Sequence, residues 1–229
     1  MSVGIITGGS RGFGRALAFD LAGDGWDLVL DAQRPEELDA VRAELSSRGG
    51  TVVAIAGDVA TADHRESVMD AAIKLASLDL LVNNASTLGQ TPLPSLATYD
   101  LEVLRRVFEV NTVAPLALIQ LALPLLKRTH GTVVSVTSDA GAEAYEGWGG
   151  YGSAKAALDH LHRVLTTEVS DVRFYSFDPG DMRTEMHQAA FSGEDISDRP
   201  EPETVVPKLR LLLDSNLPSG RYLASELGS

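Results

Sequence analysis

Short apolar runs alternate along this chain with longer segments of helical periodicity. Most of the runs are rich in Val, Ile or Leu and lack strict polar alternation, which is typical of strands covered on both faces. The expected strands are Val3–Ile6, Leu28–Leu30, Val52–Ile55, Leu78–Val82, Thr132–Val136, Val172–Phe177 and Gly220–Ala224. The expected helices are Arg15–Gly23, Pro35–Ser47, Thr61–Ala76, Thr98–Lys127 and Tyr151–Val169. This repetition predicts an α/β fold with a doubly wound parallel sheet.

The chain is expected to form one domain over residues 1–229. That length can bury a sizeable core, and neither a repeat nor a domain linker interrupts it. The segment Ser192–Pro202 is acidic and contains proline, which predicts a loop. We interpret this loop as part of a lid over a substrate.

Charge and composition narrow the function classes. The net charge is −13, and such a surface repels phosphate backbones and anionic lipid headgroups, so neither nucleic acid nor a membrane is expected as a partner. The chain has no cysteine, and its histidines lack a metal-ligand spacing, so no metal is expected. The N-terminus lacks signal-peptide character, and the longest apolar window, Pro115–Leu126, is too short to span a bilayer. A cytoplasmic protein is expected.

A glycine-rich turn, TGGSRGFG at residues 7–14, follows the first expected strand. Gly8 permits a sharp turn, Gly12 lets the backbone approach a pyrophosphate, and Gly14 lets helix and strand pack closely. Ordinary strand-to-helix turns also contain glycine trios, but the position at the start of a strand–helix repeat favours dinucleotide binding. The expected cofactor contacts in this turn are Gly8, Ser10, Arg11, Gly12, Phe13 and Gly14.

Tyr151 and Lys155 lie four residues apart and would share one face of a helix. An ammonium beside a phenol favours the phenolate, so the pKa of Tyr151 is expected to fall below its usual value of about 10. Such a phenol can exchange a proton at neutral pH. Ser138 follows an expected strand and could hydrogen-bond a substrate oxygen. Each pattern alone is common on solvated helices and at strand ends; their combination with the glycine turn favours catalysis.

In the order and spacing of these motifs, the chain resembles the short-chain dehydrogenase/reductase family from Val3 to about Tyr222. The spacing TGxxxGxG matches its single-domain members, and the segment 83–86, NNAS, stands where the family usually has NNAG. The resemblance implies a Rossmann-like sheet of about seven strands. It also implies an NAD(P)H-dependent oxidoreductase that reduces a carbonyl to an alcohol, or performs the reverse reaction.

The same resemblance implies site residues. Asn111 would bind a water that links to Lys155, and Lys155 would also bind the nicotinamide ribose. The implied catalytic residues are Asn111, Ser138, Tyr151 and Lys155. Further implied cofactor contacts are Asp58 and Val59 at the adenine, together with Asn84, Ala85, Tyr151, Lys155, Pro179, Gly180, Met182 and Thr184.

The choice between NADPH and NADH depends on the end of the second strand. Asp31 could accept hydrogen bonds from a ribose 2′-OH and so select NAD. When Glu37-Leu38 anchors the alignment, however, the family's selecting position falls on Ala32. Arg34 and Arg11 could both pair with a 2′-phosphate, so NADPH is favoured and NAD stays possible.

A small-molecule carbonyl or alcohol substrate is expected beside Ser86–Leu93, Asp139–Trp148 and Glu185–Asp198. These segments offer the apolar side chains of Tyr145, Trp148, Met186 and Phe191, with Met182 nearby, and the acids Asp139, Glu143 and Glu146. The SRGFG turn and the pair Gly147-Trp148 resemble the sepiapterin reductases of the family, which suggests a dicarbonyl or pterin-like substrate.

Two other functions compete with a reductase. A catalytically silent protein that senses a nicotinamide cofactor could share the fold, although such proteins generally lose the Tyr or the Lys. Sugar epimerases and dehydratases are usually longer chains with a different glycine spacing. The expected helices Thr98–Lys127 and Tyr151–Val169 carry broad apolar surfaces, which could simply cover the sheet. In relatives these helices form a subunit interface, so the resemblance implies a homodimer or homotetramer.

Overall fold

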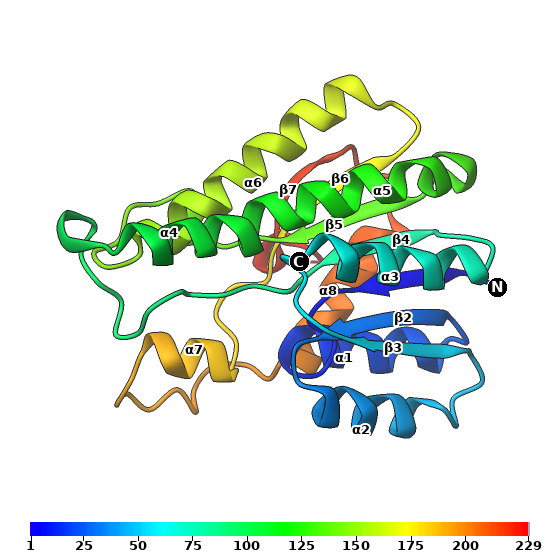
Figure 1. Cartoon of the computed structure of the whole chain (residues 1–229), viewed down its shortest axis with the longest axis horizontal. Coiled ribbons are helices and arrows are strands. Elements are labelled where there is room, and N and C mark those ends of the chain that lie inside the picture. Colours follow the sequence, from blue (N-terminus) through cyan, green and yellow to red (C-terminus); the bar gives the residue numbers. More distant parts are fainter. Residues whose placement is uncertain (229) are drawn as a thin grey trace.

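A computed structural model describes residues 1–228 as a seven-stranded, all-parallel sheet in the order β3-β2-β1-β4-β5-β6-β7 (Figure 1). The strands are β1 Val3–Ile6, β2 Asp27–Ala32, β3 Val52–Ala56, β4 Leu80–Asn83, β5 Thr132–Val136, β6 Arg173–Asp178 and β7 Gly220–Leu223. The predicted fold class is confirmed, and each expected strand is present with boundaries shifted by two residues at most. Residues of β1, β2 and β4 are buried throughout, as unbroken apolar runs require.

Two helical layers cover the sheet. On one face α1 (Gly12–Gly23), α2 (Pro35–Leu45) and α8 (Pro202–Asp214) bury an apolar core that includes Leu17, Leu38 and Leu209. On the other face α3 (Ala62–Lys74), α5 (Ala114–Thr129) and α6 (Gly149–Glu168) contribute Val68, Leu118 and Leu165 to a second core. Figure 1 shows the two layers on opposite sides of the strands.

Helix α8 is absent from the sequence-based prediction. Its residues Val205, Val206, Leu209 and Leu212 are buried against the sheet. Pro202 stands at its start, where proline is tolerated, but Pro207 lies inside it and obscures the helical pattern.

The helix expected over Thr98–Lys127 has three parts. Helix α4 (Leu101–Phe108) passes into a π-helical turn, Glu109–Val113, and then into α5. This combined segment, Leu101–Thr129, is long and apolar enough to cross a membrane by length and composition alone. Since 56% of its most apolar window is buried inside the protein, we read it as a core helix.

The segment after β6 forms a short helix, α7 (Glu185–Ala190), which stands apart from both helical layers in Figure 1. The predicted loop Ser192–Pro202 follows it and contains turns and bends up to Glu201, while its last residue, Pro202, begins α8. Its function as a lid stays a prediction, as does the expected homo-oligomer.

We predict that Leu209→Ala destabilises the protein by about 2–5 kcal/mol, because it leaves a cavity where α8 packs on the sheet. Leu211→Ala, two residues away on the same helix, removes a side chain that is 50% exposed and should cost far less. Urea unfolding of both variants measures the difference. Equal decreases in the free energy of unfolding of the two variants would show that α8 does not pack as described.

Candidate active site

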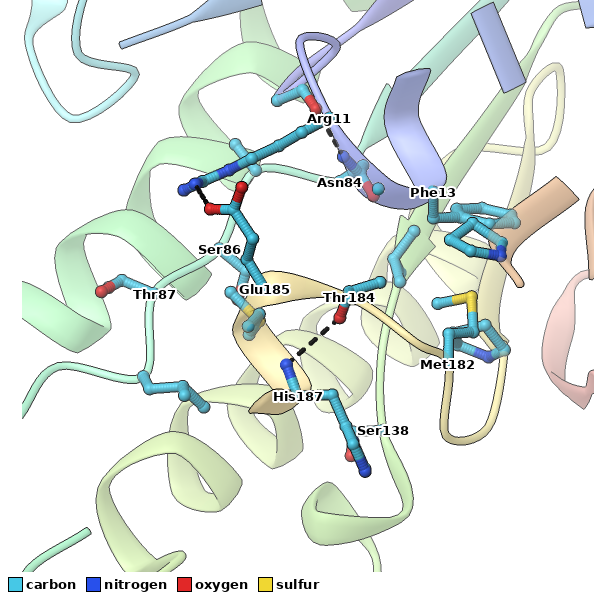
Figure 2. Close-up of a pocket in the computed structure, with 18 of the residues that line it drawn as sticks. Arg11, Phe13, Asn84, Ser86, Thr87, Ser138, Met182, Thr184, Glu185 and His187 are labelled. Atoms are coloured by element: carbon cyan, nitrogen blue, oxygen red, sulfur yellow. Dashed lines mark hydrogen bonds and ion pairs between the residues drawn. The ribbon is translucent and has the colours of Figure 1, made fainter. Parts of the chain in front are cut away.

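A cavity of about 1020 Å³ opens beyond the carboxyl ends of the strands. Loops after β1, β2, β4, β5 and β6 line it, together with α6 and α7, and Figure 2 shows part of this lining. The expected site residues that line it are Gly8, Ser10, Arg11, Gly12, Phe13, Arg34, Val59, Asn84, Ala85, Ser138, Tyr151, Lys155, Pro179, Gly180, Met182 and Thr184. Gly14, Asp58 and Asn111 are not among its lining residues.

The glycine turn has the backbone that its sequence requires. Gly8 and Gly12 have φ values of +66° and +54°, which side-chain-bearing residues rarely adopt. A Cβ on Gly14 would lie 2.5 Å from Asn84 Nδ2 and from the Gly8 carbonyl oxygen. Gly14 is therefore a site of close packing, and the bare turn leaves room at the cavity for a pyrophosphate.

Thr7 and Asn84 connect this turn to the end of β4. The Thr7 hydroxyl oxygen accepts from the backbone N–H groups of Asn84 and Ala85, each at 2.9 Å. Asn84 Nδ2 donates to the carbonyl oxygens of Thr7 at 2.8 Å and Gly8 at 3.2 Å. Asn84 thus fixes the position of the turn from inside the protein.

Asp31 borders the cavity but is almost fully buried. Its Oδ1 accepts from the Gly8 backbone N–H at 2.8 Å, and its Oδ2 lies 2.9 Å from His64 Nε2. The carboxylate therefore supports the glycine turn and connects it to α3.

The two arginines expected near a 2′-phosphate lie close together on the cavity rim. Arg11 pairs with Glu185 at the start of α7, as the dashed line in Figure 2 marks. Arg34 Nη1 lies 2.6 Å from Glu37 Oε1 and 3.9 Å from Glu185 Oε2. Glu185 thus holds both arginines near one carboxylate.

Tyr151 and Lys155 share one face of α6, as their spacing predicts. Lys155 Nζ lies 5.5 Å from the centre of the Tyr151 ring and donates to the Val136 carbonyl oxygen at 2.7 Å. Both side chains are buried, with Tyr151 8% and Lys155 2% exposed.

The prediction of a lowered Tyr151 pKa is wrong for this structure. Burial raises the pKa of the Tyr151 phenol well above its usual value, and the nearby Asp178 and Asp139 raise it further. The Ser86 hydroxyl acts in the opposite direction on the same pKa. Burial also lowers the pKa of Lys155, to about 8. The carboxylates of Asp159 and Asp178 raise the same pKa and so oppose part of this shift. Desolvation is the largest influence on the pKa of the phenol and sets the direction of its shift.

Ser138 follows β5 and lines the cavity beside Tyr151. Its hydroxyl donates to Asp139 Oδ1 at 2.9 Å and accepts from the Ala140 N–H at 3.2 Å. Asp139 Oδ2 in turn accepts from the Tyr145 hydroxyl at 3.0 Å. A substrate oxygen would have to draw the Ser138 proton away from Asp139.

Asn111 lies in the π-helical turn and is fully buried. Its Oδ1 accepts from the Thr87 N–H at 2.9 Å and from the Ser86 hydroxyl at 3.1 Å, while its Nδ2 donates to the Thr87 carbonyl oxygen at 2.8 Å. The side chain therefore fixes the segment after β4, and the water-binding role of Asn111 stays a prediction.

Asp58 does not line the cavity, although its partner Arg106 does. Its Oδ1 accepts from the Ala60 N–H, and its Oδ2 lies 2.5 Å from Arg106 Nη2. The adjacent Val59 does line the cavity. An adenine contact by Asp58 stays a prediction.

An aromatic wall stands beside Tyr151. The rings of Trp148 and Tyr151 meet edge-on, with their centres 5.7 Å apart. The Phe191 ring centre lies 5.9 Å from that of Trp148 and 4.6 Å from that of His187. The expected apolar side chains Tyr145, Trp148, Met182, Met186 and Phe191 all line the cavity.

Sequence reasoning missed one group of charged residues under the site. Arg221 of β7 contacts Asp178, Asp159 and the backbone of Ser138. Asp159 stands four residues after Lys155, so helical spacing could have signalled it. Nothing local in the sequence signals Arg221.

Comparison with known proteins identifies the family. The short chain dehydrogenase family profile matches residues 2–195. Sepiapterin reductase from Rattus norvegicus is 35% identical over 202 residues, covering 82% of this chain and 77% of that protein. An alcohol dehydrogenase from the archaeon Thermococcus sibiricus, complexed with 5-hydroxy-NADP, is similar in structure with a TM-score of 0.88 at 30% identity, covering 97% of this chain and 95% of that chain.

A short chain dehydrogenase from Shigella flexneri complexed with NADP is also similar, with a TM-score of 0.89, 26% identity and coverage of 98% and 97% of the two chains. This chain therefore belongs to the short-chain dehydrogenase/reductase family. Members of this family are NAD(P)-dependent oxidoreductases that act on CH–OH and C=O groups of small molecules.

We predict that Gly14→Ala destabilises the protein by roughly 1–3 kcal/mol and weakens dinucleotide binding, because its Cβ would overlap Asn84 and the Gly8 carbonyl. Gly23→Ala is the matched control, since Gly23 ends the same helix, is exposed and has open space around it. Thermal unfolding and fluorescence titration with NADPH measure both effects. Unimpaired binding by a stable Gly14→Ala variant would contradict the assigned packing.

Proposed function

We propose that this protein is an NADPH-dependent carbonyl reductase in which Tyr151 donates the proton. The observation that carries the proposal is the placement of Tyr151, Lys155 and Ser138 together in the cavity that the glycine turn borders. A wall of aromatic side chains borders this region, and the glycine turn offers N–H groups for phosphates.

The residues that would hold the cofactor extend across the cavity. The turn from Gly8 to Gly14 would hold the pyrophosphate, and the segment from Pro179 to Thr184 would hold the nicotinamide. When bound, the nicotinamide supplies the hydride for the carbonyl carbon. By resemblance, Lys155 would also bind the nicotinamide ribose.

Tyr151 moves the proton in this proposal. Burial raises the pKa of its phenol, so the phenol is protonated at neutral pH, which is the form that reduction needs. Ser138 would turn its hydroxyl from Asp139 to the substrate oxygen and hold that oxygen near the phenol. The reverse oxidation would need the phenolate and is therefore expected to speed up as pH rises.

The contacts of Asp31 support NADPH over NADH. A free carboxylate at this strand end would select a ribose 2′-OH and oppose a 2′-phosphate. Asp31 instead accepts from Gly8 and lies against His64, while Arg11 and Arg34 stand together at the rim. Two guanidinium groups at one place suit a phosphate.

The cavity wall and the comparisons both bear on the substrate. Trp148, Phe191 and His187 line the cavity and form a series of ring contacts that begins at Tyr151, which favours a planar or aromatic carbonyl compound. The similarity to a sepiapterin reductase supports the same class. We propose a dicarbonyl or pterin-like substrate.

Replacing Tyr151 by Phe tests the proposal directly. We expect NADPH to bind and carbonyl reduction to fall by about 10²–10⁴-fold, because the proton donor is lost. Tyr222→Phe is the control, since Tyr222 is not among the residues that line the cavity and its hydroxyl donates to the Pro218 carbonyl oxygen. Cofactor oxidation with a panel of aromatic ketones, α-dicarbonyls and pterins measures the rates. Tight cofactor binding without turnover, unchanged by Tyr151→Phe, would instead favour a cofactor-sensing protein.

Removing the two arginines tests the cofactor. In the double variant Arg11→Gln, Arg34→Gln, we expect the NADPH-to-NADH ratio of kcat/KM to fall at least about tenfold, the equivalent of about 1.4 kcal/mol. Arg42→Gln removes an exposed arginine of α2 outside the cavity lining and should leave the ratio unchanged. A wild-type preference for NADH, or an unchanged ratio in the double variant, would refute the assignment.

A further inference from the structure

We propose that Asp159, Asp178 and Arg221 form a charge network that holds the segment directly after β5 in place for catalysis and stabilises the charged form of Lys155 nearby. The proposal rests on the function proposed above and assigns positioning residues to it. The three side chains come from α6, β6 and β7, and they meet at the edge of the cavity, which Asp178 lines.

Arg221 is the centre of this network. Its Nη2 donates to Asp178 Oδ2 at 2.6 Å and to the Ser138 carbonyl oxygen at 3.2 Å. Its Nε lies 3.4 Å from Asp159 Oδ2, as an ion pair without hydrogen-bond geometry. The side chain of Arg221 is 27% exposed, that of Asp178 5% and that of Asp159 13%. Solvent therefore screens their charges only weakly.

The two residues that follow β5, Thr137 and Ser138, are both tied to the network. The Thr137 hydroxyl donates to Asp159 Oδ2 at 3.0 Å, and the next residue, Ser138, accepts from Arg221 through its carbonyl. A salt bridge that only joined β7 to the sheet would need neither contact. The backbone that presents the Ser138 hydroxyl is therefore fixed by two charged side chains.

The network also supplies compensating charge near Lys155, one helical turn away on α6 and at the end of β6. The Lys155 ammonium is buried and donates to the Val136 carbonyl oxygen of β5. Asp159 lies one turn further along α6, Asp178 ends β6, and the Tyr151 phenol stands on its own helix. Burial favours the neutral amine, whereas the two carboxylates favour the ammonium. With Arg221, the group carries two positive and two negative charges.

Arg221 keeps this balance stable. Burial raises the pKa of Asp178, and Arg221 lowers it by proximity and by hydrogen bonding. Without Arg221, Asp178 would bind a proton more readily, and the Ser138 carbonyl would lose its donor. None of the three network residues is assigned contact with the reacting atoms, so each acts through Lys155 or Ser138.

The substitution Asp159→Asn removes the negative charge of this side chain while keeping its shape. The amide keeps an oxygen that can accept from Thr137 but removes one anion beside Lys155. We expect the pKa of Lys155 to fall from about 8 by about one unit, so the loss of reductase activity at high pH should begin at lower pH. Glu168→Gln is the control, because it removes one negative charge from an exposed position on the same helix.

The titration of Lys155 can be measured without turnover. The chain has four lysines, Lys74, Lys127, Lys155 and Lys208. NMR of the whole protein with ¹³C-labelled lysine therefore follows each ammonium, and Lys155→Met assigns its signal. A lower titration midpoint of Lys155 in Asp159→Asn, together with an unchanged midpoint in Glu168→Gln, supports the network. An unchanged midpoint in a folded Asp159→Asn variant overturns it, whether or not a reducible carbonyl is found.

Arg221→Met tests the positioning of Ser138. We expect kcat to fall about 10- to 100-fold with little change in KM for the carbonyl, and Arg221→Lys to recover part of the loss because it keeps the charge without the planar fork. A kcat of Arg221→Met equal to that of wild type would overturn the assignment of Arg221 as the residue that positions Ser138. Failure of the proposed function itself looks different, since wild type would then reduce none of the carbonyls.

Discussion

The hydrogen bonds between Thr7 and Asn84 join the two central strands on which the rest of the site depends. β1 neighbours both β2 and β4, so the strand order reverses at this point, and open parallel sheets bind ligands at such a reversal. Asn84 holds the first turn from the side of β4, while Asp31 holds it from the side of β2. The turn is thus fixed from both sides before any ligand arrives, which reduces the ordering that binding would require.

Burial and charge oppose each other throughout the catalytic half of the cavity. The sheet and α6 remove Tyr151 and Lys155 from water, which raises the pKa of one and lowers the pKa of the other. Both shifts favour the neutral forms. The carboxylates of Asp159 and Asp178 raise the pKa of Lys155 and so favour its charged form. Arg221 in turn lowers the pKa of Asp178 and so keeps that carboxylate ionised. A charged lysine in a dry site is therefore a property of four residues together.

The strands and the motifs could be predicted because each is a local pattern. Apolar runs marked six of the strands, a seventh was expected at Gly220–Ala224, and the spacing of Tyr151 and Lys155 placed them on one helix face. What failed depended on tertiary structure. Pro207 hid α8, whose helix forms because Leu209 and its neighbours pack on the sheet. The pKa of Tyr151 depends on how deeply the phenol is buried, which spacing cannot reveal. Arg221 lies 62 residues from Asp159, and only the folded sheet brings them together.

The network around Arg221 and the pair of Arg11 with Glu185 differ in one consequential way. The first is largely shielded from solvent, whereas Arg11 and Glu185 are 49% and 66% exposed. Dissolved ions screen exposed charges within about 10 Å at 0.1 M salt and reach buried ones far less. Ionic strength therefore acts on the two halves of the cavity unequally: the half that would recognise a phosphate responds to the surrounding electrolyte, while the half that would move the proton retains its own electrostatic environment.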